Sequence, residues 1–242
     1  MREVEFRDLG VMPYGECWQL QQELFQGLVE NKKRGSEGAL QIDKDGGRST
    51  AKDINAGYIL MVEHPAVYTL GKSGKDSNML LGEDQLKAIG ADYYHIDRGG
   101  DVTFHGKGQI VVYPILDLEV LGIGLKEYIW ALEEAVIATA ANWDIPAQRI
   151  ASAAGVWVKK GAAWSKICAI GVKSSRYITM HGLAMNVETD LKYFDYINPC
   201  GFTDRGATSL AVESSSPVSL DEAKELLLNN LIKILNVKIY KK

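Results

Sequence analysis

Two residues of this chain could supply nucleophilic and proton-transfer chemistry: a cysteine in a predicted loop and a lysine in a predicted strand. Cys200 lies in the segment NPCG at 198–201, where a φ-restricting proline and a permissive glycine flank the thiol. This composition predicts a sharply turned loop, and reactive groups concentrate on such loops. A free thiol has a pKa of about 8.5, so a nearby cation or base must activate it. The loop alone leaves two interpretations of Cys200 open, an inert thiol and a nucleophile.

Lys166 is the candidate proton acceptor. Strand alternation in the apolar segment around it puts Lys166 on the same face as Cys168, Ile170 and Val172. A lysine on such a face usually extends its amine past the strand end, and the pattern alone favours that structural explanation. The alternative is a partly desolvated amine, whose pKa falls so that it can accept a proton. Cys168 on this face is interpreted as a packing residue.

A glycine-rich stretch at 98–109, with the sequence RGGDVTFHGKGQ, contains an arginine and a histidine between two strand-like segments. Glycine weakens strands, so four glycines here indicate positive φ angles or a close approach to the backbone. Glycine content alone favours a hairpin, and the alternative is a substrate cradle with Arg98 and His105 on its rim. His105 and His181 each precede a glycine near a strand end, which is compatible with lining a cleft. The four histidines lack metal-ligand spacing, so we expect no metal site.

The elements that must position these residues can be predicted from apolar periodicity. An opening strand at 3–9 precedes an amphipathic helix from Tyr14 to about Val29, on whose apolar stripe Cys17 is a small core residue. The further strands are expected at 58–64, 67–70, 92–97, 102–105, 110–118, 155–159, 163–173 and 177–187, with helices at 83–89 and 125–142. A capping box at 219–222 opens a final helix. Helices around many strands predict one mixed α/β domain that spans residues 1–242.

Residues 31–57 differ in character from the rest of the chain. They are polar and rich in glycine, with few apolar side chains to hold them against a core. We therefore expect a long exposed loop insertion, mobile in places.

Composition bounds the function. The chain has 242 residues, of which 46% are hydrophobic and 24% charged, enough for a sizeable core. The net charge of -4 gives no electrostatic reason to expect nucleic acid as a partner. No apolar run reaches the roughly 20 residues of a membrane span, and the polar start is unlike a secretory signal. Three cysteines without a CxxC pair fit a reducing cytoplasm rather than a disulfide framework.

Several segments together resemble one family, the lipoyl(octanoyl) transferases of lipoate biosynthesis. The first is RGGDVTFHG at 98–106, followed by Gly108-Gln109. The other five are EHP at 63–65 with VYTLG at 67–71, GVW at 155–157, KI at 166–167 with AIGV at 169–172, HGLAMNV at 181–187 and PCG at 199–201, and all six follow the order of the family. One glycine-rich block is weak evidence, whereas six ordered blocks are specific.

The resemblance implies a fold, an activity and a set of site residues. The fold is that of lipoate and biotin protein ligases, a mixed β-sheet flanked by helices. The activity moves an octanoyl group from acyl carrier protein to a lysine of a lipoyl domain through a cysteine thioester, with no cofactor. Cys200 matches the acyl-accepting cysteine, and Lys166 matches the lysine that lowers its pKa and transfers protons. The implied substrate contacts are Arg98, Gly99, Gly100, Asp101, Val102, Thr103, Phe104, His105, Ala169, Ile170, Gly171, Gly182, Leu183 and Ala184.

The implied acceptors are the lipoyl domains of 2-oxoacid dehydrogenase complexes and the glycine cleavage H protein. Two features depart from the family pattern: Lys107 replaces the usual proline, and the 31–57 segment is longer than expected. The alternatives are an ATP-dependent lipoate- or biotin-type ligase, which needs no cysteine nucleophile, and a non-catalytic protein that binds an acylated carrier. The paired Lys166 and Cys200 favour the transferase over both.

Overall fold

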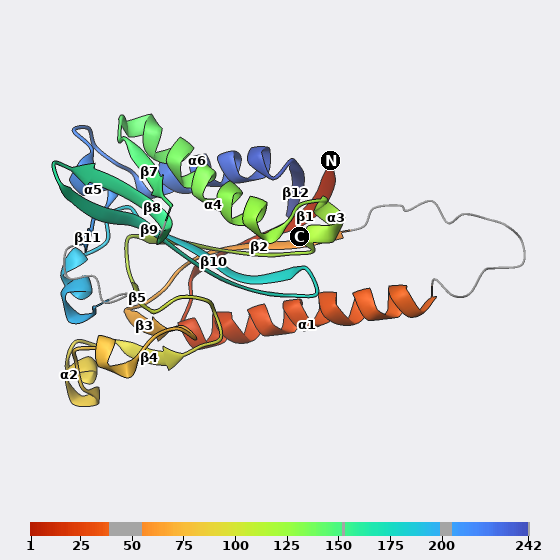
Figure 1. Ribbon diagram of the computed structural model, residues 1–242, viewed down its shortest axis with the longest axis horizontal. Helices are drawn as coiled ribbons and strands as arrows, with labels where there is room; N and C mark the ends of the chain where they lie inside the picture. Colours follow the sequence, from red (N-terminus) through yellow and green to blue (C-terminus); the bar gives the residue numbers. More distant parts are fainter. Residues whose placement is uncertain (39–54, 152, 199–204, 242) are drawn as a thin grey trace, which may run out of the picture.

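The protein is built on a nine-stranded mixed sheet, seen in a computed structural model that describes residues 1–38, 55–151, 153–198 and 205–241 (Figure 1). Eight strands follow one another in the order β12-β1-β2-β6-β10-β9-β8-β7, and β11 pairs with β9. Their bounds are β1 (Arg2–Val11), β2 (Asn55–Glu63), β6 (Gln109–Leu116), β7 (Ala147–Ile150), β8 (Ala153–Lys160), β9 (Ala163–Ser175), β10 (Ile178–Asn186), β11 (Arg205–Ala207) and β12 (Val237–Lys241). Most of the pairings are antiparallel, but β1 runs parallel to both β2 and β12. The mixed sheet predicted from the sequence is confirmed.

Helices cover both faces of this sheet. The longer ones are α1 (Tyr14–Gly38), α4 (Leu125–Ala140) and α6 (Leu220–Ile234). The shorter ones are α2 (Glu83–Ala88), α3 (Leu118–Leu121), α5 (Leu210–Glu213) and the 3₁₀ helices η1 (Asp76–Asn78), η2 (Ala141–Trp143) and η3 (Leu191–Tyr196). Helices α4 and α6 lie on one face and α1 on the other (Figure 1). None of the helices in the described part of the chain is long and apolar enough to cross a membrane.

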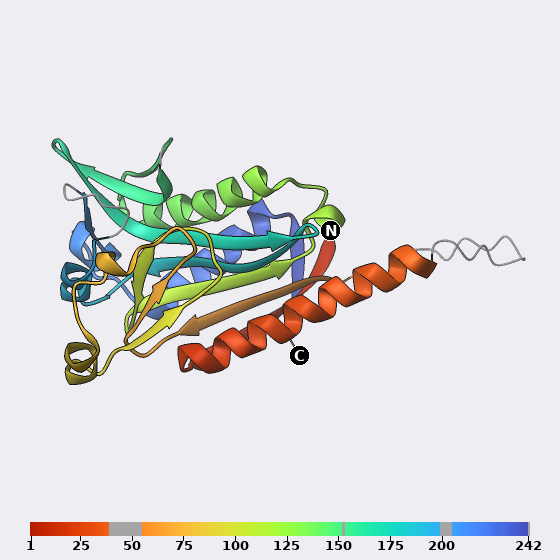
Figure 2. The same ribbon diagram turned by 60° about the horizontal axis from the view of Figure 1, so that its bottom comes forward.

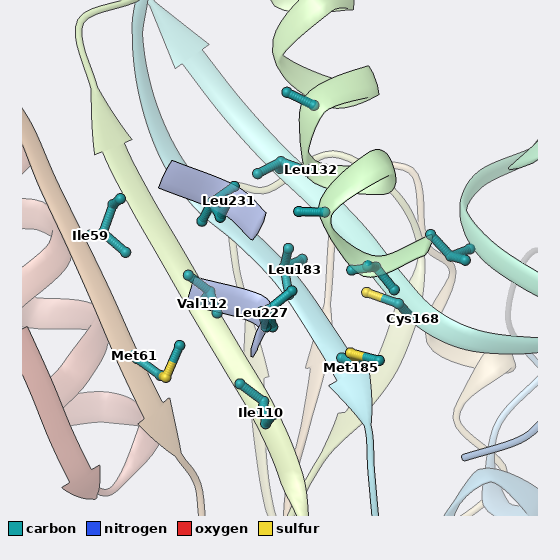
Figure 3. Close-up of a cluster of buried hydrophobic side chains, with 14 of the residues drawn as sticks. Ile59, Met61, Ile110, Val112, Leu132, Cys168, Leu183, Met185, Leu227 and Leu231 are labelled. Atoms are coloured by element: carbon teal, nitrogen blue, oxygen red, sulfur yellow. The ribbon is translucent and has the colours of Figure 1, made fainter. Parts of the chain in front are cut away.

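The central strands are buried on both faces because their side chains alternate between two cores. On β2, Ile59 and Met61 pack against the α4–α6 side, whereas Leu60 and Val62 pack under α1. This two-sided burial explains the near-continuous apolar sequence of the strand. Figure 3 shows the α4–α6 side, where Cys168 packs with aliphatic side chains of the sheet and of both helices. Cys168 and Cys17 are fully buried, so the packing role predicted for both is confirmed.

A second, three-stranded sheet has the order β4-β3-β5, with β4 (Asp92–His95), β3 (Val67–Leu70) and β5 (Val102–His105). The strands on either side of the glycine turn at 106–108 therefore belong to different sheets, because β5 pairs with β3 and β6 pairs with β2 and β10. The hairpin interpretation of residues 98–109 is wrong. The stretch instead carries the chain from the small sheet to the large one.

Two of its glycines have backbone angles that other residues rarely adopt. Gly100 has φ 92° and Gly108 has φ 78°. At Gly108 a Cβ would also lie 2.7 Å from the backbone of Glu188, so this turn is packed against the end of β10. Lys107, the departure from the family pattern, is exposed at the tip of the turn.

Helix α1 is longer than predicted and changes the expected 31–57 loop. Residues 31–38 are helical and residues 55–57 belong to β2, while 39–54 lie outside the described residues. Lysine, arginine and glutamate are good helix formers, so a polar sequence does not end a helix. Lys32 anchors this part through Nζ, which lies 2.8 Å from an Asp117 carboxylate oxygen and 2.7 Å from one of Glu119. The C-terminal part of α1 projects past the sheet (Figure 2).

The remaining predictions differ from the structure mainly at element ends. The cap of the final helix is confirmed, since the Ser219 hydroxyl accepts a hydrogen bond from the Glu222 N–H at 3.4 Å. The sequence analysis did not predict β7, β11 or β12, all of which are short strands at or near sheet edges.

Candidate functional site

A cavity of about 1050 Å³ lies where the two sheets meet and joins most of the predicted site residues. Its predicted wall residues are Arg98, Gly100, Asp101, Val102, Thr103, His105, Lys166, Ala169, Ile170, Gly171, Gly182, Leu183 and Ala184. Three segments, at 98–105, 166–171 and 182–184, therefore contribute to one cavity. His181 also lines the cavity, as expected for both histidines that precede a glycine.

Two predicted contacts are absent from this wall, and the predicted nucleophile is not described. Phe104 is 1% exposed and stacks on Tyr193 of η3 at 4.5 Å between ring centroids, so it packs in the small-sheet core instead. The Gly99 N–H donates to the Val172 carbonyl at 3.0 Å and ties the glycine loop to β9. Both residues adjoin residues of the wall without lining the cavity themselves, and their contact with substrate stays a prediction. Cys200 lies outside the described residues.

The cavity has a closed inner end lined by aromatic and imidazole rings. Tyr14, Tyr113, His105 and His181 contribute to it, and each is less than a tenth exposed. The Tyr14 ring stacks on the His105 ring, with centroids 5.9 Å apart and planes 8° from parallel. Burial raises the pKa of the Tyr14 hydroxyl well above its usual range, so it stays neutral.

The inner histidines are neutral as well. His105 Nδ1 lies 2.8 Å from the Gln109 side-chain oxygen, and the Gln109 amide nitrogen donates to the Phe104 carbonyl and to Asn186. This network assigns the proton of His105 to Nδ1, which donates to Gln109. Burial is the main cause that lowers the pKa of His105 to about 3, and His64 lowers it further. Burial likewise lowers the pKa of His64 to about 4.

His181 adopts an unusual backbone conformation for a strand residue, with φ 63°. Its Nε2 donates to an Asp97 carboxylate oxygen at 2.9 Å, and Lys173 forms an ion pair with the other oxygen. The hydrogen bond from His181, helped by Lys173, holds the pKa of Asp97 well below its usual range. Burial lowers the pKa of His181. The ring is therefore a neutral part of the wall, fixed in orientation by a carboxylate.

Arg98, at the start of the glycine-rich stretch 98–109, has a cationic side chain that bonds to the protein. It is 8% exposed, and one guanidinium nitrogen donates to the Thr69 carbonyl at 2.8 Å and to the Thr69 hydroxyl at 3.0 Å. The other donates to the Gly99 carbonyl at 3.1 Å. Arg98 thus holds the loop to β3.

The lining also includes Lys166 and several exposed residues, where the cavity opens to solvent, and we call this part the mouth. Its rim includes Ala154, Lys192, Asp195 and Gly206, all of which are exposed. Lys166 is half-buried, and its Nζ lies 4.5 Å from the ring centroid of Trp157. Asn198 and Gly206 flank the segment that contains Cys200, and both line the cavity.

The strand alternation predicted around Lys166 is broken by a bulge. Val156 pairs with Cys168 but Trp157 pairs with Lys166, which leaves Ile167 as an extra residue. Ile167 and Cys168 are consecutive, yet both are fully buried in the α4–α6 core. Lys166 therefore lines the cavity wall, whereas Cys168 belongs to the core. The prediction that the two share a face is corrected.

Sequence reasoning missed several wall residues. The sequence pattern did not indicate that Tyr14 lines a cavity, because an aromatic residue at the start of an amphipathic helix is usually a core residue. Gln109 and Trp157 lay inside the motifs but had no assigned role. Among the described residues, no group of three or more histidine, cysteine, aspartate or glutamate side chains could hold a metal ion.

The fold and the cavity define a catalytic domain of the lipoyl protein ligase A/B type. The family model described as "Lipoyl protein ligase A/B catalytic domain" matches residues 13–232. The chain is 51% identical to an octanoyltransferase of Bacteroides thetaiotaomicron, over 96% of this chain and 95% of that protein. It is 44% identical to an octanoyltransferase of Parabacteroides distasonis, over 97% and 99% respectively. The chain belongs to the lipoyl protein ligase A/B catalytic domain family, within its octanoyltransferases.

Solved structures support the same fold. A bi-partite lipoate protein ligase of Thermoplasma acidophilum, studied with its E2 lipoyl domain, aligns over 100% of this chain and 87% of its own, with a TM-score of 0.68 at 13% identity. A lipoate-protein ligase A bound with ATP aligns over 76% and 75%, with a TM-score of 0.61 at 16% identity. At this identity the likeness shows the fold alone, so it does not favour ATP chemistry here. The predicted ligase-like fold and the family resemblance are confirmed.

Proposed function

We propose that this enzyme transfers an octanoyl group from acyl carrier protein to a lysine of a lipoyl domain, through a thioester on Cys200. The observation that carries the proposal is a cavity that joins Lys166, at an open mouth, to an inner wall of aliphatic, aromatic and neutral imidazole side chains. The charged guanidinium of Arg98 in this wall is bonded to the protein. The identity of 51% to an octanoyltransferase over almost the whole chain supports the same activity.

The inner part of the cavity suits an aliphatic chain. Ala169, Ile170, Leu183 and Ala184 form part of its wall, and the polar groups at the inner end are neutral or bonded to the protein. Each buried methylene contributes about 0.8 kcal/mol. Six methylenes of an octanoyl group therefore contribute roughly 5 kcal/mol of binding free energy.

In the first half-reaction, the Cys200 sulfur attacks the carbonyl carbon of the incoming thioester while Lys166 takes the thiol proton. The tetrahedral intermediate collapses, the bond to the carrier sulfur breaks, and Lys166 returns the proton to that sulfur. One thioester replaces another, so the step is nearly balanced and needs no ATP.

In the second half-reaction, the amine of the acceptor lysine attacks the Cys200 thioester and transfers a proton through Lys166. The carbon–sulfur bond breaks, an amide forms, and the Cys200 thiol is restored. The amide is more stable than the thioester, which drives the transfer forward.

The proposal extends to partners and location. Octanoyl-acyl carrier protein is the donor, and the lipoyl domains of 2-oxoacid dehydrogenase complexes and the glycine cleavage H protein are the acceptors. The reaction takes place in the cytoplasm, and residues 1–242 act as one catalytic domain.

The decisive experiment is intact-mass analysis after mixing with octanoyl-acyl carrier protein. We expect a covalent octanoyl adduct that hydroxylamine removes and that maps to Cys200. The variant Cys200→Ser loses the thioester, whereas Cys17→Ser, with its thiol buried in the core, serves as the matched control. If the unmodified enzyme transfers octanoate without ever carrying it on Cys200, the covalent mechanism is wrong.

The ATP-dependent ligase is separated from the transferase by one further assay. A ligase modifies a lipoyl domain with free octanoate and ATP and does not need Cys200. We expect no product under those conditions. Product formed by Cys200→Ala would reverse the assignment.

A further inference from the structure

Trp157 on β8 is placed to control the charge and position of the Lys166 amine. The two residues are cross-strand partners in the β8–β9 ladder, and the Lys166 Nζ lies 4.5 Å from the centre of the Trp157 ring. An ammonium over an indole face is attracted by the negative ring quadrupole, and tryptophan gives the strongest such contact. The neutral amine gains no such attraction.

The ring is held firmly. Trp157 is 3% exposed, and its Nε1 donates to the Ala153 carbonyl at 3.2 Å, four residues back on the same strand. A side chain that is buried and bonded at its edge loses little further freedom when it contacts a cation. The indole ring is therefore a rigid surface that the flexible lysine side chain contacts.

The backbone of Lys166 also fixes the position of its side chain. The bulge at Ile167 sets the direction of Lys166 toward the cavity, and the Lys166 carbonyl accepts the Thr208 N–H at 2.9 Å. Across the ladder, Gly155 has φ 108°, and a Cβ there would lie 2.5 Å from the Cys168 carbonyl oxygen and 3.6 Å from Lys166 Cε. Glycine is therefore required where β8 passes the Cys168 carbonyl, and at this point the strand lies in contact distance of the lysine side chain.

We propose that Trp157 is a positioning residue of the transfer reaction, which holds the Lys166 amine at the cavity mouth and favours its protonated form. This inference rests on the proposed function of Lys166. It differs from a packing role because it predicts an effect on proton affinity as well as on stability.

Other titratable groups surround this end of the cavity in the described part of the chain. Cys168 lies on β9, Glu133 on α4 accepts the Gly155 N–H at 3.1 Å, and Lys192 and Asp195 lie on η3 at the rim. Burial raises the pKa of the Cys168 thiol far above neutrality, so it stays uncharged. Glu133 forms an ion pair with Arg149 at 3.0 Å. These groups are unchanged in the variants below, so a shift between variants reports on Trp157.

Loss of the indole shifts the pH–rate profile in the same direction whether the proton exchanged between Cys200 and Lys166 is on the sulfur or on the amine. In the proposed mechanism Cys200 and Lys166 exchange a proton, so the proposal treats them as a pair with two macroscopic pKa values. The indole stabilises only those forms that contain the ammonium, so its loss lowers the sum of the two values. One limb of the pH–rate profile therefore moves to lower pH, by roughly half a unit to one unit, and neither limb moves up.

The test measures single-turnover acylation by octanoyl-acyl carrier protein across pH in Trp157→Met and Trp157→Phe. Methionine fills apolar volume without a ring face, so we expect the full shift. Phenylalanine retains a weaker ring face, so we expect a smaller shift in the same direction. If circular dichroism shows that Trp157→Met does not fold, Trp157→Phe alone decides. A pH–rate profile of Trp157→Phe with both limbs at the wild-type pH then overturns the inference.

The chain offers a matched control on the same two strands. Lys159 Nζ lies 5.5 Å from the ring centroid of Trp164, and that pair is outside the cavity wall. Trp164→Met should leave both limbs in place, and an equal shift there would show that Trp157 acts only through the sheet. Failure of the wild-type enzyme to acylate at Cys200 would defeat the proposed function. Normal acylation with unmoved limbs in both Trp157 variants would defeat this inference alone.

Discussion

The two ends of the cavity use opposite physical strategies. At the inner end, polar side chains are buried and kept neutral, as burial does for Tyr14, His105 and His181. At the mouth, Lys166 is half-buried and lies among exposed groups of both charges on η3. A wall whose polar groups are neutral or, like Arg98, bonded to the protein can bind an alkyl chain, whereas proton transfer needs a group whose charge can change. The comparison assigns recognition to one end and chemistry to the other.

Replacing the amine at the mouth tests the largest effect. We expect Lys166→Ala to slow acylation about 10²- to 10⁴-fold, the usual loss when a general acid–base group is removed. The free energy of unfolding should change little, because the side chain is half-buried. Rapid-quench kinetics with hexanoyl and octanoyl carriers should show an equal loss for both. Lys159→Ala, an exposed lysine on the adjacent strand, is the control, and an unchanged rate in Lys166→Ala would return that lysine to a structural role.

A larger side chain in the cavity wall tests whether the inner end recognises the acyl chain. Ala184 lies on β10 in the cavity wall, and leucine there would occupy space that we assign to the chain tail. Two methylenes are worth about 1.6 kcal/mol, so wild type should prefer octanoyl over hexanoyl by roughly 15-fold. We expect the preference of Ala184→Leu for octanoyl over hexanoyl, measured in competition assays, to be about tenfold lower than that of wild type. Ala163→Leu, at an exposed site on β9, should keep it, and a uniform loss for both chains in Ala184→Leu would contradict the division of labour.

The neutral histidines give a smaller effect, on stability. The pKa of His105 is about 3 in the folded protein and about 6.5 when unfolded, so the unfolded chain binds the proton first on acidification. The stabilisation is therefore complete above pH 6.5 and is lost as pH falls toward 3. Protonation of His105 in the unfolded chain alone should lower the free energy of unfolding by about 1 kcal/mol between pH 7 and pH 5.5.

Urea unfolding at a series of pH values measures that slope. His105→Gln removes one titrating group and should flatten the slope. If His105→Gln has the wild-type slope, the inner end does not keep this ring neutral.

Local sequence patterns predicted most of the elements. β3, at 67–70, matches its prediction because apolar residues and turn signals are close in sequence. Helix α1 was predicted too short, since periodicity follows apolar burial and the helix continues on polar residues and the ion pairs of Lys32. The site motifs identified the family from residues alone. They did not predict Tyr14 or Trp157 as wall residues, because those roles depend on neighbours distant in the chain.

The sequence by itself determined most of the strands, the positions of the longer helices, the buried cysteines, the family and the candidate chemistry of Lys166 and Cys200. Only the tertiary structure decided that β5 and β6 belong to different sheets, that a bulge separates Lys166 from Cys168, and that an indole lies over the amine. It also decided that the inner histidines are neutral. The physical reason is common to all four: strand pairing, register and desolvation arise from contacts between different elements, which the pattern within one element does not determine.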